Sequence, residues 1–402
     1  MATTQPTILQ IVPELDTGGA ELSTIEIAQA IVAGGGRALV ASEGGDMAAE
    51  IGAVGGELIF FRAATKLPLN MWFNAGRLKR IIIEENVSLV HARSRAPAWS
   101  GYWATKDGEI PFVTTYHGAY SEKNRFKKFY NQIMASGNLV IANSQYTSDL
   151  VQSRYATPAE KLRVVYRGLD AELYDRDAIS SERADTLRRK WGIDPSKRII
   201  LNVARLTHWK GQSVIIEAAQ KLKSEGKLDD VVFVFAGSAQ SHVRYEVNLR
   251  AEIKSANLES HFYFAGHVGD IPAALAISYL AVVASTQPEA FGRAAAEAQA
   301  MACPIISTNI GAPPETVRAI PNCSANEVTG WLIPPSDSSA LAGAIAEALA
   351  LTPEGHSAIG ARGRTHVAAN FSLENMKLRT LSVYDELLGT DLAAKFGEKT
   401  RG

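Results

Sequence analysis

Two basic residues lie close together in the run ARLTHWKGQS, which follows a predicted strand at Ile199–Val203 and precedes a predicted helix at Gln212–Leu222. Arg205 carries a planar guanidinium that matches phosphate oxygens, and Lys210 carries a compact positive charge. Ligands gather at the carboxyl ends of the strands in open α/β sheets. The pair therefore predicts a diphosphate site, with two solvated surface charges as the alternative.

A second run, STQPEAFGRAAAEAQAMACP, carries two carboxylates near a helix start. It follows a predicted strand at Leu280–Ala284, with Glu289 in the loop and Glu297 inside the helix that begins near Gly292. Amides around Phe291–Arg293 predict an anion site, and carboxylates accept hydrogen bonds from sugar hydroxyls. A sugar nucleotide suits this combination: we expect Glu289 to hold the transferred sugar and Glu297 the ribose. A solvated helix position is the alternative for Glu297.

A pair of glycines follows the first predicted strand, Ile8–Val12, in PELDTGGAE. Gly18 and Gly19 lack a Cβ atom, so the backbone amides of the helix that follows can approach a phosphate closely. A glycine-rich turn that merely reverses the chain is the alternative interpretation.

Three histidines are candidates for the chemistry. His117 ends the predicted strand Phe112–Tyr116 in TTYHGAY, where a structural hydrogen bond is the alternative to a catalytic role. The segment His91–Arg95 follows another predicted strand and is a candidate lining for an acceptor. His208 stands inside the basic run and is a candidate for donor contact.

The elements that must position these residues form two series of alternating strands and helices, which is typical of parallel sheets covered on both faces. The helical spacing is clear at Ala20–Ile31 and Trp72–Glu84. The first series of strands covers Ile8–Val12, Ala38–Ala41, Leu58–Phe61, Leu89–His91, Phe112–Tyr116, Leu139–Ala142 and Leu162–Tyr166. The second covers Ile199–Val203, Val231–Ala236, Phe262–Ala265, Leu280–Ala284, Ile305–Ser307 and Trp331–Ile333.

The charged stretch Asp170–Arg189 has no strand character and is interpreted as the connection between two domains. We predict an α/β protein with two Rossmann-like, doubly wound domains facing across a cleft. The predicted bounds are 1–178 for an acceptor-side domain and 179–370 for a nucleotide-binding domain. A terminal helix at Leu373–Leu388, within 371–402, is expected to cross back onto the first domain.

Composition narrows the function classes. With 41 basic and 42 acidic residues in 402, the chain lacks the excess positive charge of nucleic-acid binders. Two cysteines suit a reducing compartment. No apolar run approaches the roughly 20 residues of a spanning helix, and MATTQPTILQIV lacks the charged start of a secretion signal. We expect a cytoplasmic protein.

Together these motifs resemble the family-4 retaining glycosyltransferases of the GT-B fold. Glu289 and Glu297 have that family's E-x7-E spacing, Arg205 and Lys210 its R-x4-K spacing, and TGGAE and the turn GAPPE at Gly311–Glu315 are similar to its glycine loop and late turn. Ala312 and Ala290 depart from the common pattern without removing a functional group.

The resemblance implies roles for individual residues. Arg205 and Lys210 would bind the diphosphate, Glu289 the donor sugar and Glu297 the ribose, and His117 would lie near the reactive face of the sugar. The implied reaction moves a hexose from a UDP- or GDP-sugar to a glycan or lipid-linked acceptor with retention, in bacterial surface polysaccharide or lipopolysaccharide synthesis. Front-face displacement needs no metal and no cofactor beyond the donor. The alternatives are a sugar-nucleotide 2-epimerase, a non-catalytic sugar-nucleotide-binding protein and an NAD-dependent dehydrogenase, although TGGAE lacks G-x-G-x-x-G spacing.

The segment SEKNRFKKFYNQIM, residues 121–134, predicts a basic amphipathic helix. Such a helix suits a peripheral contact with anionic lipid at the inner face of the membrane. An ordinary helix packed on the sheet is the alternative. The segment combines the cations Lys123, Arg125, Lys127 and Lys128 with Phe126, Phe129, Tyr130, Ile133 and Met134 at helical spacing.

Overall fold

The computed structural model describes residues 5–16, 18–118, 120, 122, 124–240 and 242–401, without the side chain of Arg401. The chain divides into two compact units. The first combines Met1–Gly168 with Glu374–Gly402, and the second is the continuous stretch Leu169–Leu373. None of the described helices is long and apolar enough to cross a membrane.

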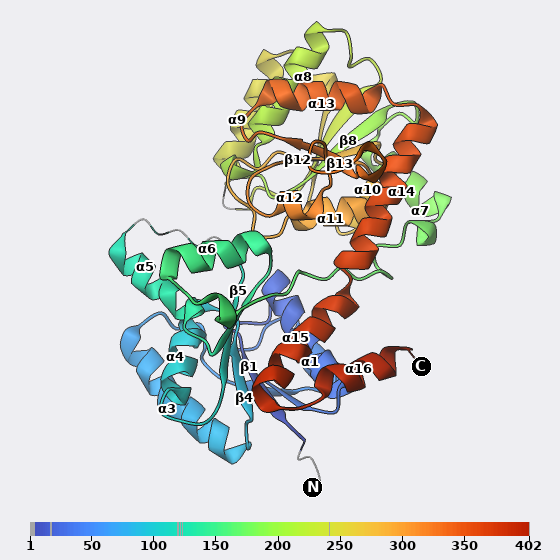
Figure 1. Cartoon of the computed structure of the whole chain (residues 1–402). Coiled ribbons are helices and arrows are strands. Elements are labelled where there is room, and N and C mark those ends of the chain that lie inside the picture. Colours follow the sequence, from blue (N-terminus) through green and yellow to red (C-terminus); the bar gives the residue numbers. More distant parts are fainter. Residues whose placement is uncertain are drawn as a thin grey trace. The chain divides into compact units, whose positions relative to one another are not determined.

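The first unit is built on a seven-stranded parallel sheet with the order β3-β2-β1-β4-β5-β6-β7. Helices α3 and α4 cover one face, and α1, α15 and α16 lie on the other (Figure 1). The strands are β1 Thr7–Ile11, β2 Arg37–Ser42, β3 Glu57–Phe60, β4 Leu89–Ala92, β5 Phe112–Tyr116, β6 Leu139–Ala142 and β7 Leu162–Val164. The helices are α1 Gly19–Ala33, α2 Ala48–Ala53, α3 Pro68–Glu84, α4 Arg95–Thr105, α5 Arg125–Gln132, α6 Gln145–Tyr155, α15 Leu373–Leu388 and α16 Leu392–Arg401.

The second unit has a six-stranded parallel sheet with the order β10-β9-β8-β11-β12-β13. An apolar core packs α8, α9 and α13 on one face of this sheet (Figure 1). The strands are β8 Arg198–Val203, β9 Val231–Ala236, β10 Phe262–Gly266, β11 Leu280–Val283, β12 Ile305–Thr308 and β13 Gly330–Ile333. The helices are α7 Ser181–Trp191, α8 Gln212–Ser224, α9 Val243–Ser255, α10 Ile271–Ala276, α11 Arg293–Ala300, α12 Pro313–Thr316, α13 Ser338–Leu349 and α14 Pro353–Asn370.

In each sheet the winding direction reverses once. The reversal lies between β1 and β4 in the first unit and between β8 and β11 in the second. At such a point the loops from neighbouring strands turn to opposite faces and leave a crevice at the strand ends, which is where open α/β folds bind ligands. The loops after β8 and β11 carry the basic run and the first of the two carboxylates predicted from the sequence.

The boundary between the units falls after Gly168, ten residues before the predicted one. The stretch interpreted as a connection contains α7, which belongs to the second unit. Two hydrogen bonds of 2.7 Å join the Arg183 guanidinium to the Asp270 carboxylate, and Trp191 at the end of α7 is buried. Charged residues mark the solvent face of this helix, so charge alone misled the prediction. The second boundary falls after Leu373 instead of after residue 370.

Candidate functional site

The loop from β8 to α8 places Arg205 and Lys210 ahead of a helix N-terminus. Gly211 lies between loop and helix with φ of +71°, and a Cβ atom there would overlap the carbonyl oxygen of Ala284 on the neighbouring strand loop. This close approach requires glycine. The Arg205 side chain is exposed and makes no hydrogen bond or ion pair with a described residue, and its backbone carbonyl accepts a 3.1 Å bond from Gln212.

The loop from β11 to α11 faces this basic loop. Gly292 caps α11, as the sequence predicted, so the first amides of the helix are free of intrahelical partners. The backbone amide of Thr286 donates to the Trp209 carbonyl at 2.8 Å. The two loops are therefore joined through their backbones beside β8 and β11.

Lys210 and Glu289 form an ion pair across these loops. Lys210 Nζ lies 2.6 Å from Glu289 Oε1, and the two side chains are only 17% and 10% exposed. The Ser285 hydroxyl donates to the same carboxylate oxygen, and the Lys210 ammonium lies 4.2 Å from the centre of the Trp209 ring. The structure thus brings together two residues that the sequence assigned to different parts of one ligand.

The turn GAPPE supports the Glu289 loop from the other side. Gly311 has φ of +85°, and a Cβ atom there would overlap the Glu289 backbone. The amide of Ala312 donates to the Glu289 carbonyl at 2.9 Å. Ala312 itself is buried with φ of −83°, a conformation open to any residue, which explains why alanine serves where relatives of the predicted family have glycine.

Glu297 lies one turn into α11 and is buried, so it is not the solvated helix residue considered above. Its carboxylate accepts a 2.7 Å bond from Arg293 Nε. Burial raises the pKa of the neighbouring Tyr174, and the Glu297 carboxylate raises it further. The Phe291 side chain is buried against Phe371, with ring centres 5.5 Å apart.

The predicted glycine loop lies in the first unit. Gly19 begins α1 and Gly18 precedes it in an extended conformation, with φ of −171°. A Cβ atom at Gly18 would overlap the Glu21 carboxylate, which therefore lies over this backbone. An anion at the start of α1 would have to displace that carboxylate, which the sequence prediction did not foresee.

His117 follows β5 and contacts Arg167, which follows β7. Arg167 Nη2 lies 2.8 Å from His117 Nδ1. Burial holds the pKa of His117 well below its usual range, the charges of Arg167 and Arg93 lower it further, and the Arg93 carbonyl opposes them. His117 is thus a neutral ring in a cationic setting.

The other two histidine candidates contact side chains of their own units. His91 is fully buried within β4, and its ring nitrogens bond the hydroxyls of Tyr384 and Thr115 at 2.7 Å each. Burial, then the Arg93 charge, holds its pKa well below the usual range. Both ring nitrogens are thus engaged in the core, although the ring also borders the small cavity beside His117, so the role of His91 at an acceptor site stays a prediction. His208 packs on Tyr245 with ring centres 4.1 Å apart.

The predicted residues form two sets. Arg205, Lys210, Glu289 and Glu297 belong to the second unit, with the first three on the loops beside its reversal point; Gly18, Gly19 and His117 belong to the first unit. The sequence did not single out Ser285 and Arg167, which contact Glu289 and His117. Both come just after predicted strands, and that position was the available signal.

Comparison with known proteins identifies the family. Residues 183–366 match the description "Glycosyl transferases group 1" and residues 17–173 match "Glycosyltransferase Family 4". A solved glycosyltransferase from Rickettsia africae is 34% identical with a TM-score of 0.86, over 96% of this chain and 99% of that one. The chain belongs to the family-4, group 1 glycosyltransferases and has their GT-B fold of two Rossmann-like units.

Two further relatives are informative. Anabaena HepE, solved in complex with UDP-glucose, is 23% identical with a TM-score of 0.78, over 94% of this chain and 99% of that one. The lipopolysaccharide core biosynthesis mannosyltransferase LpsB of Rhizobium meliloti is 26% identical over 226 residues, which are 56% of this chain and 61% of that protein.

Proposed function

We propose that the protein transfers a hexose, with retention of configuration, from a UDP- or GDP-sugar to a glycan or lipid-linked acceptor. The observation that carries the proposal is the half-buried Lys210–Glu289 pair at the reversal point of the second sheet. An ammonium and a carboxylate at one place suit a ligand that presents a diphosphate beside sugar hydroxyls.

Donor binding would exchange partners within this pair. The donor diphosphate takes Lys210, together with Arg205, which has no ion-pair partner among the described residues, while Glu289 turns to a hydroxyl of the donor sugar. Both side chains keep a hydrogen-bonded counterpart throughout, which avoids leaving a charge unpaired in a half-buried place. Glu297 would accept from the ribose through the carboxylate oxygen that Arg293 Nε does not occupy.

In the proposed reaction the bond between the anomeric carbon and the phosphate oxygen breaks, and the acceptor oxygen bonds the same face of the sugar. The acceptor proton passes to the departing phosphate oxygen. Arg205, Lys210 and the N-termini of α8 and α11 stabilise the charge that develops on the diphosphate. Because these groups supply the positive charge that the diphosphate needs, we propose that the reaction does not depend on a metal ion.

The relatives support parts of this proposal. Anabaena HepE was solved with UDP-glucose, which favours a uridine donor over a guanosine one. The Rhizobium relative acts in lipopolysaccharide core biosynthesis, which favours a bacterial surface glycolipid as the product. We propose a cytoplasmic enzyme on the side of the membrane where nucleotide sugars are made.

We also propose that the segment 121–134 contacts anionic lipid at that membrane. In α5, Phe126 and Phe129 are 87% and 63% exposed, so these two rings do not pack on the sheet as in the alternative interpretation. Ile133 and Met134, beyond the end of α5, are buried in the core of the unit as that interpretation expected. Arg125, Lys127 and Lys128 lie on the same short helix. The fourth cation, Lys123, lies outside the described residues.

The test begins with binding and ends with chemistry. A thermal-shift panel of UDP, GDP and ADP sugars identifies the base, because a ligand of the folded state raises the midpoint. Transfer is then assayed with and without EDTA, on lipid-linked and soluble acceptors, with the anomeric configuration of the product read by NMR. An acceptor-independent epimer, or binding without turnover on any acceptor, would replace the proposal with an epimerase or a binding protein.

A further inference from the structure

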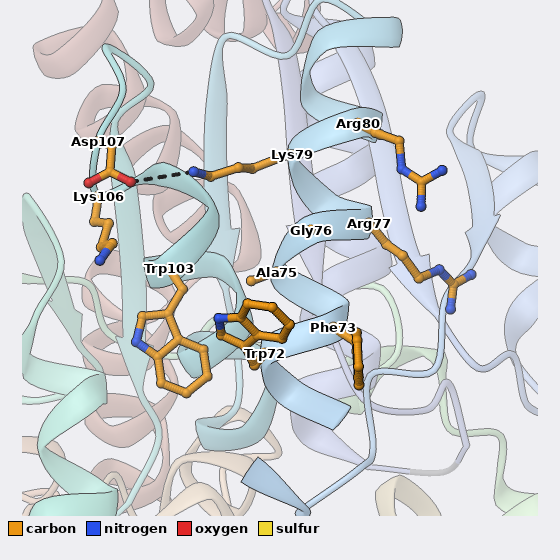
Figure 2. A pocket seen from close by; sticks show the side chains of 10 residues that line it. All are labelled: Trp72, Phe73, Ala75, Gly76, Arg77, Lys79, Arg80, Trp103, Lys106 and Asp107. Carbon is orange, nitrogen blue, oxygen red and sulfur yellow. Dashed lines mark hydrogen bonds and ion pairs between the residues drawn. The ribbon is translucent and has the colours of Figure 1, made fainter. Parts of the chain in front are cut away.

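An open groove of about 920 Å³ runs along α3 in the first unit (Figure 2). Its apolar lining is Trp72, Phe73 and, from α4, Trp103. Trp72 and Phe73 are 62% and 55% exposed, whereas Met71 and Leu78 of the same helix are buried in the core. Packing of the unit therefore accounts for one face of α3 and leaves the aromatic face unexplained.

The groove is also basic. Its cations are Arg77, Lys79, Arg80 and Lys106, against the single carboxylate of Asp107. Figure 2 shows Lys79 reaching across to Asp107, from which its ammonium lies 3.4 Å, while Arg77 and Arg80 extend from the other side of α3. The whole chain has a net charge of only −1, so this excess is local.

Aromatic side chains link the groove to α5. Trp103 packs on Trp99 with ring centres 5.3 Å apart, and Trp99 packs on Phe129 at 5.2 Å. The exposed aromatic face of α3 and the basic helix predicted from the sequence are thus connected parts of one surface of the first unit.

We propose that this α3 groove docks the protein onto an anionic lipid bilayer, with Trp72 and Phe73 in the headgroup region and the guanidinium and ammonium groups on lipid phosphates. Exposed tryptophan with lysine and arginine is the composition of membrane interfaces, whereas protein interfaces are depleted in lysine. The benefit of this membrane contact for the reaction rests on the proposed function, in which the acceptor is linked to a lipid.

The test is co-sedimentation of the full chain with vesicles of phosphatidylglycerol and phosphatidylcholine, or of phosphatidylcholine alone. Wild type should bind the anionic vesicles and lose binding at high salt. The variant Arg77→Gln/Lys79→Gln/Arg80→Gln should bind roughly a hundredfold more weakly, at about fivefold for each charge. Trp72→Ser/Phe73→Ser should weaken binding to both vesicles. The matched control Lys190→Gln/Lys223→Gln/Lys254→Gln removes three exposed lysines of the second unit and should bind like wild type.

The proposal would be overturned if the groove variants bound anionic vesicles as tightly as the control variant does. It would also be overturned if wild type bound only the phosphatidylcholine vesicles and not the anionic ones. Loss of binding by Arg125→Gln/Lys127→Gln/Lys128→Gln with retention in the groove variants would assign the contact to α5 instead. Donor binding is measured separately by calorimetry with UDP. If the vesicle test fails while UDP binding is intact, the proposed lipid contact of the groove is wrong and the proposed sugar transfer is unaffected.

A second inference concerns the form of the His117 ring. The Arg167 guanidinium donates every hydrogen bond that it makes and accepts none. Its 2.8 Å contact with His117 Nδ1 therefore makes Nδ1 the acceptor, and in a neutral ring the proton must lie on Nε2. Arg167 Nη1 is itself held by the Gly19 carbonyl at 2.9 Å and by the Ser23 hydroxyl, so the guanidinium is fixed by α1.

His117 lines a small cavity of about 20 Å³, the size of one water or hydroxyl group. Three buried polar atoms in its lining have no hydrogen-bond partner of normal geometry among the described residues: His117 Nε2, Arg93 Nη2 and Asn143 Oδ1. Asn143 Nδ2 donates to the His117 carbonyl at 3.3 Å, which leaves Oδ1 as an acceptor. Two donors and one acceptor are the complement of a single hydroxyl.

We infer that Arg167 is a positioning residue, which holds His117 as the neutral Nε2–H tautomer so that it donates to a hydroxyl, from substrate or water, in this cavity. In this role His117 is a hydrogen-bond donor and does not act as a base. The identity of the hydroxyl as part of a substrate rests on the proposed function, whereas the tautomer is a property of the protein without substrate.

Nitrogen NMR of protein labelled with ¹⁵N-histidine tests the tautomer without any activity assay, with His117→Gln assigning the signals. Wild type should show a pyridine-like Nδ1 and a protonated Nε2 at His117. Arg167→Met should lose this preference and lower kcat roughly tenfold to a hundredfold with little change in donor KM. Arg167→Lys should restore part of both. The matched control Arg189→Met, at an exposed arginine of the second unit, should keep the tautomer.

A protonated Nδ1 in wild type, or an unchanged ring in Arg167→Met, would overturn the inference. An unchanged tautomer with reduced kcat would show that Arg167 acts by another route and would equally contradict it. If the tautomer changes as expected while no variant or wild type transfers sugar, the inference stands and the proposed function fails.

Discussion

At the scale of single residues, the contacts that a side chain makes in the second unit's site determine what its substitution should do. Arg205→Ala removes a cation from the proposed diphosphate position and should raise the transfer barrier by about 2 to 4 kcal/mol, as for loss of one oxyanion donor. The fold should be unaffected because the side chain is exposed. Single-turnover rates against wild type give the barrier, with the exposed Arg189→Ala as control; near-normal rates would remove Arg205 from the diphosphate site.

Substitutions of the two carboxylates, Glu289 and Glu297, should have different effects because the carboxylates have different neighbours. Glu289→Gln breaks the ion pair and releases Lys210, so free nucleoside diphosphate should bind at least as tightly as in wild type while sugar transfer falls steeply. Glu297→Gln should instead weaken nucleotide binding by about 1 to 2 kcal/mol, since it loses a charged acceptor for ribose. Isothermal titration with UDP distinguishes them, and equal losses of affinity in both variants would contradict the assigned roles.

At the scale of elements, the start of α8 depends on Gly211, which has a positive φ and leaves no space for a Cβ atom. Gly211→Ala meets a positive φ and overlap with the Ala284 carbonyl, whereas Gly226→Ala meets a similar φ of +67° with nothing within 4 Å. Both should lose about 1 kcal/mol from the φ alone. Gly211→Ala should lose more and should also weaken UDP binding, because the two loops move apart. Thermal midpoints and UDP affinity of the two variants test this, and equal effects would reject the steric argument.

The sequence predicted most strands well because each is a short apolar run bounded by turns; Phe112–Tyr116, Leu139–Ala142 and Val231–Ala236 coincide with β5, β6 and β9. It also located the start of α11 through Gly292 and predicted a helix at Gln212–Leu222, close to the bounds of α8. It could not predict the Lys210–Glu289 contact, because that needs the strand order that brings β8 beside β11. The contact between His91 and Tyr384 could not be predicted for the same reason, since Tyr384 lies at the far end of the chain.

For the whole molecule, buried neutral histidines predict sensitivity to acid. The pKa values of His91 and His117 are lowered by burial, so below about pH 6.5 the unfolded chain takes up protons that the folded chain does not. Stability is full above that pH and falls as pH decreases, by about 1.4 kcal/mol per pH unit for each histidine. The groups facing His91 are Tyr384, Thr115, Arg93 and His117, and the charge of His91 lowers the pKa of His117 further.

Urea unfolding of the full chain between pH 7.5 and 5.5 measures this dependence. His117→Gln should show a shallower decline than wild type, whereas His242→Gln, which changes an exposed histidine, should follow wild type. Parallel curves for wild type and His117→Gln would show that His117 takes up its proton equally in both states.

The contact between His91 and Tyr384 also sets an order of events during synthesis. The second unit is one continuous stretch, so a nascent chain that has emerged through Leu373 already contains all of it. The first unit's sheet is translated before this stretch, yet the helix that supplies its buried Tyr384 is translated after it. During translation the first unit therefore begins to form before the second unit but is completed after it. Until α15 has emerged from the ribosome, one ring nitrogen of His91 in β4 lacks Tyr384 and can form non-native contacts.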